Sequence, residues 1–379
     1  MRSEFATATR IIFGEGAAAT LPELARGYGT RPLVVTGASP QRVASLISTL
    51  AAEIFTVPGE PTVDLVREGA RRVRDASCDV VVSIGGGSAI DAGKAIAAIA
   101  TNGGEPLDFL EVVGKGGAIT APPLPFIAVP TTAGTGSEVT RNAVLGSPEH
   151  GVKASLRSPL MLPRVALVDP ELTYLLPPAI TAGTGLDALT QLIEPYVSAR
   201  ANPLADPFCV DGMTRVARAL RRAFYAGDDF AARRDMSLAS LFGGLALANA
   251  GLGVVHGLAS PLGGRSNAPH GALCAALLPH GMAANVDALR VRASQHPALA
   301  RYATIARLLT GRDSANADDG IDWAKNLCLD LKIPPLRAWG ITEGDLPGVA
   351  QKAARASSMQ ANPLPLTGGE ILAVLAAAL

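Results

Sequence analysis

The first half of the chain alternates short apolar runs with amphipathic stretches. We predict strands at 31–37, 53–59, 78–88 and 124–132, and helices at 40–53, 62–77 and 89–102. The runs VVV and FIAV show no polar alternation, which is typical of strands buried on both faces of a parallel sheet. Strands that alternate with helices predict an α/β layer structure.

From about residue 178 the pattern changes to helical periodicity. The segments 188–199, 208–226 and 232–251, and those after Ala298, all space their apolar positions as helices do. Pro177 and Pro178 mark a plausible boundary. We therefore predict an α/β domain over 1–178 and an all-helical domain over 179–379, with the cleft between them as the default ligand site.

The composition fits this division and narrows the class of protein. At roughly 100–200 residues per domain, 379 residues suit two domains. The 33 basic and 33 acidic residues balance, so nothing favours nucleic acid or an anionic membrane as a partner. The four cysteines are scattered without a CxxC pair, the N-terminus lacks the apolar core of a secretory signal, and no apolar run approaches the length of a membrane span. We expect a soluble, cytoplasmic protein.

The segment SIGGGSAIDAGK (83–94) follows a predicted buried strand and opens a helix. Gly85, Gly86 and Gly87 leave room for a ligand to approach the backbone, and Ser88 can cap the helix. The amides of a helix N-terminus bind anions such as a pyrophosphate. We interpret the segment as a phosphate site, although an ordinary tight turn would use similar residues and the motif is neither GxGxxG nor a P-loop.

A second polar segment, AVPTTAGTGSEVT (128–140), follows the next apolar strand. Thr131, Thr132 and Thr135 crowd hydroxyl groups around two glycines at a strand end. Ligands of open α/β sheets bind at such ends, so ligand contact is favoured over a plain surface loop.

Four residues of the helical half raise the question of a metal. Asp187 and Gln191 stand four apart, which places both on one face of a helix. His256 and His270 flank a Gly/Pro-rich stretch that could bend the chain back on itself. Spacing alone leaves a metal site and a polar helix face equally open.

Seven ordered segments together resemble the iron-containing (group III) alcohol dehydrogenase family. They are FGEGA, GGGSAIDAGK, AVPTTAGTGSEVT, SPLMLPRVALVDPEL, TAGTGLDALTQLIEPYVS, HGLASPLGG and PHGALCAALLPHGMAAN. The resemblance spans nearly the whole chain. It implies a dehydroquinate synthase-like architecture, in which a dinucleotide-binding α/β domain precedes a helical metal-binding domain, and a homodimer or higher homo-oligomer.

The resemblance also implies a ligand set for Fe²⁺ or Zn²⁺. The metal would be held by Asp187, Gln191, His256 and His270. Relatives commonly carry histidine at the place of Gln191, and many carry another at the place of Ser260. A glutamine donates a neutral amide oxygen instead of an imidazole nitrogen, so we expect weaker binding or a shifted metal preference. Asp187 would be the only anionic ligand.

For the cofactor, the resemblance implies NAD or NADP. Gly85, Gly86, Gly87 and Ser88 would receive the pyrophosphate, and Thr131, Thr132, Thr135 and Lys153 would line the ribose and nicotinamide. NAD-preferring relatives often end the first strand with an aspartate, where this chain has Gly37, Ala38 and Ser39. Without a carboxylate to repel a 2′-phosphate, NADP is at least as well suited as NAD.

The implied activity is hydride transfer between nicotinamide and a small alcohol or carbonyl compound, with a metal acting as Lewis acid. By family position, Asn142 would lie near the substrate. Three alternatives stay open. One is a metal-independent, maleylacetate reductase-like enzyme; another is a zinc polyol dehydrogenase resembling glycerol dehydrogenase. The third is a dinucleotide-binding protein that has lost turnover, which the changes at Gln191 and Ser260 would suit.

Overall fold

A computed structural model describes residues 3–379 and divides the chain into two compact units. One unit contains residues 7–132 and 136–174, and the other contains residues 3–6, 133–135 and 175–379. The first is an α/β unit and the second is helical throughout. The predicted fold class is confirmed, while the domain boundary after residue 178 stays a prediction.

The α/β unit is built on a six-stranded parallel sheet in the order β1-β8-β5-β4-β2-β3. The strands are β1 (Arg10–Phe13), β2 (Pro32–Thr36), β3 (Glu53–Thr56), β4 (Val80–Gly85), β5 (Phe126–Pro130) and β8 (Val165–Val168). All five strand pairs are parallel. Every residue of β2, β4, β5 and β8 is buried, as the runs VVV and FIAV predict for β4 and β5.

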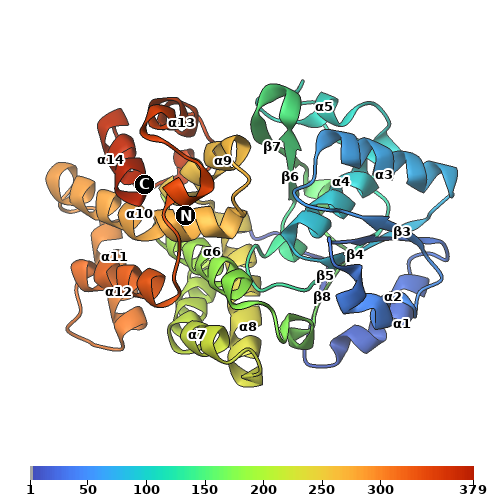
Figure 1. Cartoon of the computed structure of the whole chain (residues 1–379), viewed down its shortest axis with the longest axis horizontal. Coiled ribbons are helices and arrows are strands. Elements are labelled where there is room, and N and C mark those ends of the chain that lie inside the picture. The colour runs from blue at the N-terminus through green and yellow to red at the C-terminus, as the bar shows by residue number, and fades with distance from the viewer. Residues whose placement is uncertain (1–2) are drawn as a thin grey trace. The chain divides into compact units, whose positions relative to one another are not determined.

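Helices cover both faces of this sheet (Figure 1). The longer helices α3 (Val63–Asp75) and α4 (Gly87–Asn102) pack on one face, and α1 (Leu21–Arg26) and α2 (Ala44–Ile47) pack on the other. A short helix, α5 (Pro106–Phe109), precedes β5. α4 is buried from Ala89 to Ile99, and most of its residues are alanine, glycine or isoleucine, which pack against the sheet and the neighbouring elements.

Two features of the α/β unit differ from the sequence prediction. The helix expected over 40–53 consists of a 3₁₀ turn (Pro40–Val43) and the single turn of α2. Ser48 and Thr49 each bond a carbonyl three residues back, and such side-chain bonds compete with helix continuation. The sequence analysis also missed an antiparallel hairpin of β6 (Asn142–Ser147) and β7 (Val152–Arg157).

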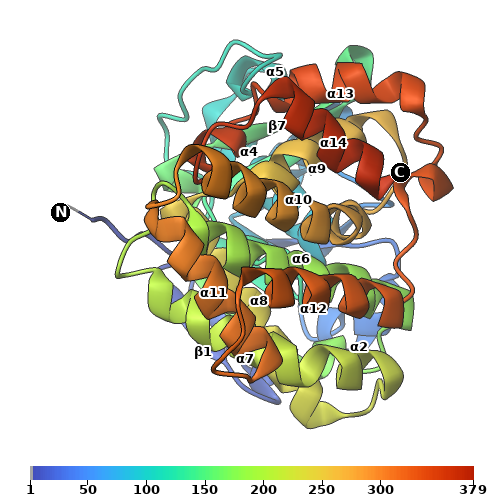
Figure 2. The same ribbon diagram turned by 90° about the vertical axis from the view of Figure 1, so that its left-hand side faces the viewer.

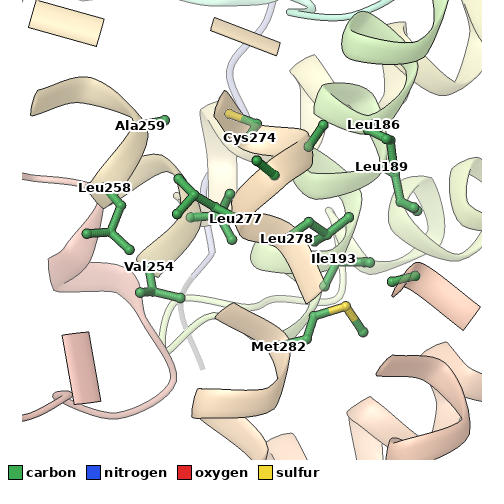
Figure 3. Packing of buried hydrophobic residues seen from close by; sticks show 14 of the residues in the cluster. Leu186, Leu189, Ile193, Val254, Leu258, Ala259, Cys274, Leu277, Leu278 and Met282 are labelled. Carbon is green, nitrogen blue, oxygen red and sulfur yellow. The ribbon is translucent and has the colours of Figure 1, made fainter. Parts of the chain in front are cut away.

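The helical unit contains α6 (Pro178–Val197), α7 (Asp206–Tyr225), α8 (Phe230–Ala250), α9 (Val254–Arg265), α10 (His270–Arg292), α11 (Pro297–Thr310), α12 (Ala317–Asp330), α13 (Leu346–Ala353) and α14 (Gly368–Ala378). α6 is central, packed against α7, α8 and α10 (Figure 2). Leucines and other aliphatic side chains of α6, α9 and α10 form a continuous core (Figure 3).

α10 is the one described helix that is by itself long and apolar enough to cross a membrane, and the bent pair of α8 and α9 passes the same test only if taken together. Yet 72% of the most apolar window of α10 is buried inside the structure. Packing among neighbouring helices therefore accounts for its apolar character.

Candidate active site

Helix α6 carries one row of polar side chains into the core of the helical unit. Asp187 and Gln191 lie one turn apart, and Glu194 follows near the next turn. All three are almost fully buried, at 1%, 2% and 5% exposure. Carboxylates and amides in such a place need partners, because unpaired burial of polar groups is costly.

Glu194 positions His256, the third residue of α9. One carboxylate oxygen, Oε2, lies 2.7 Å from His256 Nδ1, and the other, Oε1, accepts a hydrogen bond from the Val255 amide at 2.7 Å. A carboxylate accepts only, so His256 donates through Nδ1, and in the neutral ring Nε2 then carries the lone pair. This is the arrangement by which proteins orient metal-ligating histidines.

The first turn of α10 brings two further side chains to the same place. His270 begins the helix and Cys274 follows one turn later. The His270 Nε2 atom lies 3.8 Å from Asp187 Oδ1 and 3.5 Å from Cys274 Sγ. Within the described residues, Asp187, His256, His270 and Cys274 form the one group of three or more such side chains whose ligand atoms all lie within 4.8 Å of one another.

The unpaired atoms of this cluster fit a bound cation. Asp187 Oδ1, Gln191 Oε1 and His256 Nε2 are buried and make no hydrogen bond. Asp187 Oδ1 and His256 Nε2 lie 3.3 Å apart, so they form an ion pair when the ring is protonated and two facing acceptors when it is neutral. Buried polar atoms are normally satisfied, so three acceptors left unpaired in one region indicate a missing positive partner.

Electrostatics support the same conclusion. Burial alone would raise the pKa of Asp187, but His270 and His256 hold it below its usual value. Burial alone would lower the pKa of His256, but Cys274, Asp187 and Glu194 raise it well above the usual value. Burial alone would also lower the pKa of His270, but Cys274 and Asp187 raise it to about 9. The cluster therefore favours a positive charge.

In the α/β unit, the predicted cofactor residues gather at the carboxyl ends of adjacent strands. Gly37 follows β2, Gly85 ends β4, and Thr131 follows β5 and donates its amide to the Gly85 carbonyl at 2.9 Å. A Cβ atom on Gly85 would lie 3.2 Å from the Gly37 nitrogen, and one on Gly86 would lie 3.3 Å from Thr132 Oγ1. The close approach of these backbones leaves a cradle that larger residues would fill.

Helix α4 starts from this cradle at Gly87, with Gly86 as its N-cap. Its first amides are free of helical partners and suit a phosphate. The prediction that Ser88 caps the helix is wrong: Ser88 lies inside the first turn, because the helix starts at Gly87, two residues earlier than predicted.

A buried lysine fixes the loop that follows β5. Lys94, on α4, donates to the carbonyls of Ser137 and Asn142 at 2.8 Å each, and to Thr140 Oγ1 at 3.0 Å. Burial lowers the pKa of Lys94 to about 8, although Asp91 and Glu138 oppose the shift. The loop is thus tied to the helix that starts at the glycine cradle.

The remaining predicted residues lie elsewhere. Ser39 is exposed beyond Gly37, and Thr135 belongs to the short stretch grouped with the helical unit. Lys153, on β7, pairs with Glu60 at 3.4 Å. Asn142 opens β6, opposite Arg157 of β7.

Sequence reasoning missed Glu194, Cys274 and Lys94. Glu194 stands seven residues after Asp187 and Cys274 four after His270, so each continues a helical row already identified. Extending both rows by one turn would have found them. Lys94 is the last residue of the segment SIGGGSAIDAGK, but it is not followed by the Ser or Thr of a P-loop, so the motif gave it no role.

Known proteins resemble this chain over its whole length. The model of the family "Iron-containing alcohol dehydrogenase" matches residues 8–170, and the C-terminal model of the Fe-containing family matches residues 181–379. Alcohol dehydrogenase 4 of Schizosaccharomyces pombe is 36% identical over 97% of this chain and 87% of its own length.

Solved structures agree. A 1,3-propanediol oxidoreductase superposes with a TM-score of 0.91, at 34% identity and with all of both chains covered. A sulfoacetaldehyde reductase from Bifidobacterium kashiwanohense, in complex with NAD+, gives a TM-score of 0.87 at 31% identity, over 100% of this chain and 99% of its own.

The fold and the site therefore define a metal-dependent, NAD(P)-linked oxidoreductase that acts on CH–OH groups, with the dehydroquinate synthase-like architecture. The chain belongs to the iron-containing alcohol dehydrogenase family. The predicted family, enzyme class and cofactor types are confirmed.

Proposed function

We propose that this enzyme interconverts small alcohols and aldehydes or ketones, and that Asp187, Gln191, His256 and His270 surround its metal. The support is the group of unpaired buried acceptors in the helical unit. When bound, a divalent metal supplies Lewis acidity at the carbonyl oxygen, and NADPH or NADH supplies the hydride.

The chain's own residues prepare this chemistry. Glu194 holds the proton of His256 on Nδ1 and so keeps the Nε2 lone pair directed at the metal position. Asp187 contributes the negative charge and His270 a second nitrogen donor. The apolar side chains packed behind α6, α9 and α10 keep the buried side of the cluster dry (Figure 3), which strengthens its electrostatic interactions.

On the cofactor side, we propose that the glycine cradle at Gly85–Ser88 receives the pyrophosphate, and that Thr131, Thr132, Thr135 and Lys153 line the ribose and nicotinamide. The shape of the cradle and the free amides of α4 support the first assignment. The Lys94 bonds hold the Asn142 carbonyl, which supports Asn142 as a residue fixed near the substrate.

We further propose that NADP is accepted at least as well as NAD, because no carboxylate follows β2 at Gly37, Ala38 or Ser39. A side chain at Gly37 would meet nothing within 4 Å, so Gly37→Asp is sterically tolerated. This change should raise KM for NADPH more than KM for NADH. Equal effects on both cofactors would contradict the placement of the ribose at Gly37.

We also propose a homodimer or higher homo-oligomer, which the family resemblance supports, and a cytoplasmic location, which the four scattered cysteines support. Light scattering after gel filtration tests the first, since a monomer at micromolar concentration would refute it. Cell fractionation tests the second.

The decisive experiment combines metal analysis with turnover. The protein is purified without oxygen, its metal is measured, and NADPH and NADH oxidation is assayed with short aldehydes before and after chelation. We expect near-stoichiometric metal and activity that chelation abolishes and metal restores. His256→Ala should lose both, whereas His280→Ala, which alters a histidine of α10 outside the cluster, should keep both. Turnover without metal would instead favour a maleylacetate reductase-like enzyme, and cofactor binding without turnover would favour a binding protein.

A further inference from the structure

Cys274 is the least expected member of the cluster. It lies on α10 one turn after His270, is 0% exposed, and faces the same group of side chains as Asp187 and His256. In Figure 3 it stands at the end of the row of α10 side chains that continues with Leu277 and Leu278. All three side chains belong to the apolar core, and Cys274 Sγ also lies 3.5 Å from His270 Nε2.

The separations in the cluster match those of donors around one tetrahedral metal ion. Metal–nitrogen and metal–oxygen bonds of about 2.0–2.1 Å imply donor separations of roughly 3.3 Å, and a metal–sulfur bond of about 2.3 Å implies a sulfur–nitrogen separation of roughly 3.5 Å. The observed values are 3.3 Å for His256–Asp187, 3.8 Å for His270–Asp187 and 3.5 Å for Cys274–His270. The other three separations among the four donor atoms are within 4.8 Å, so a bound ion would draw the donors somewhat closer together.

The unpaired atoms supply an independent argument. Asp187 Oδ1 and His256 Nε2 are buried without a hydrogen bond, and both belong to the group that contains Cys274 Sγ. A cysteine that only filled space would not explain why these two acceptors lack partners. A single cation in contact with all of them would.

We propose that Cys274, as a thiolate, is a ligand of the metal together with Asp187, His256 and His270. The inference rests on the proposed metal-dependent function and adds a donor to it. It differs from the sequence-based expectation that Asp187 is the only anionic ligand. Two anionic donors balance the charge of a divalent ion, and the sulfur makes up for the imidazole that Gln191 lacks.

Gln191 then becomes the weaker donor. Its Oε1 atom lies next to Gly243 of α8, 3.4 Å from the position that a Cβ atom would occupy there. A neutral amide oxygen binds zinc or cobalt less strongly than a thiolate does. The thiolate should shift the preference of the site toward Zn²⁺ over Fe²⁺, because sulfur donors favour the softer ion.

The competing explanation is a neutral thiol that donates a weak hydrogen bond to His270 Nε2. That geometry is compatible with the 3.5 Å separation. It predicts that sulfur never contacts a bound metal, and spectroscopy separates the two cases without any variant.

The test uses the full chain, stripped of metal and reloaded with Co²⁺. A cobalt–thiolate bond produces a charge-transfer absorption in the near ultraviolet, which nitrogen and oxygen donors do not. We expect this absorption in the unaltered protein and in Gln191→Ala, and its loss in Cys274→Ser. Cys328→Ser is the matched control: Cys328 lies outside the cluster and bonds the Ala275 carbonyl, so its replacement should leave the spectrum unchanged.

Metal selectivity gives a second readout. Replacing a residue that only orients a metal ligand typically lowers metal affinity about 10–100-fold. Replacing a ligand itself, as in Cys274→Ser, should therefore weaken Zn²⁺ binding at least about 10-fold. Fe²⁺ binding should weaken less. Stoichiometric Co²⁺ without the absorption, or an absorption that survives in Cys274→Ser, would overturn the thiolate and leave the proposed function standing. A protein that binds no Co²⁺, Zn²⁺ or Fe²⁺ would overturn both.

Discussion

Glu194 offers the sharpest test of how the site is built, because one carboxylate serves two donors. Its Oε1 accepts from the Val255 amide and its Oε2 accepts from His256 Nδ1, both at 2.7 Å. Glu194→Gln keeps the size and shape of the side chain but leaves a single acceptor. Whichever way the amide turns, its NH₂ group faces one of the two donors.

The consequence falls on the tautomer of His256. Where the new NH₂ group faces His256 Nδ1–H, two donors oppose each other. The ring can relieve this by moving its proton from Nδ1 to Nε2, and Nε2 then has no lone pair for the metal. Loss of such an orienting partner typically costs about 10–100-fold in metal affinity. At about 1.4 kcal/mol for each factor of ten, the loss is about 1.4–2.8 kcal/mol.

Zinc affinity, measured by competition with a chromophoric chelator, checks this value. Asn362→Ala is the control, because Asn362 accepts from the neighbouring Val254 amide and does not contact the imidazole. It should lower the melting temperature while leaving the zinc affinity of the folded protein unchanged. If folded Glu194→Gln binds zinc as tightly as the unaltered protein, the carboxylate does not set the tautomer and the reasoning fails.

Three further changes probe the α/β unit. Lys94→Met removes three hydrogen bonds and the cation that lies 4.0 Å from buried Asp91, so it should cost about 3–5 kcal/mol of unfolding free energy in urea titrations. Burial raises the pKa of Glu138 from 4.5 to about 7, so the folded protein holds a proton that the unfolded chain has lost between these values. Stability should therefore fall as pH rises across that range, and Glu138→Gln should flatten the dependence of the urea midpoint on pH. Gly85→Ala would place a methyl group 2.6 Å from the Ala89 Cβ and should cost about 1–3 kcal/mol and weaken NADPH binding. The matched Gly37→Ala meets nothing within 4 Å and should stay within about 0.5 kcal/mol in urea titrations.

The parallel sheet and the helical half could be predicted because their patterns are long and consistent. β5 is apolar throughout and β4 carries the unbroken run VVV, and both strands are buried at every position, as in a sheet covered on both faces. The hairpin of β6 and β7 was missed for the opposite reason. Its two strands are short and mix buried with half-buried residues, so neither contains the long apolar run that marks a buried strand.

Neighbouring site residues could be predicted where they share a helix, but not where they come from different helices. The spacing of Asp187 and Gln191 predicts that they lie on one face of a helix, because residues four apart are neighbours there. Nothing in the sequence tells how α9 and α10 approach α6, so the contact of Glu194 with His256 depends on packing among three helices.

The fourth donor shows the limit of reasoning from motif positions. The family resemblance implies an imidazole where this chain has Gln191, and therefore predicts a weakened site. The structure places a thiol on the opposite helix, where it can supply the missing donor from another direction. A metal site is defined by the donors that converge on one point and not by the chain positions that provide them. A ligand lost from α6 can therefore be replaced from α10, and a sequence that appears to have lost part of its site can retain a complete one.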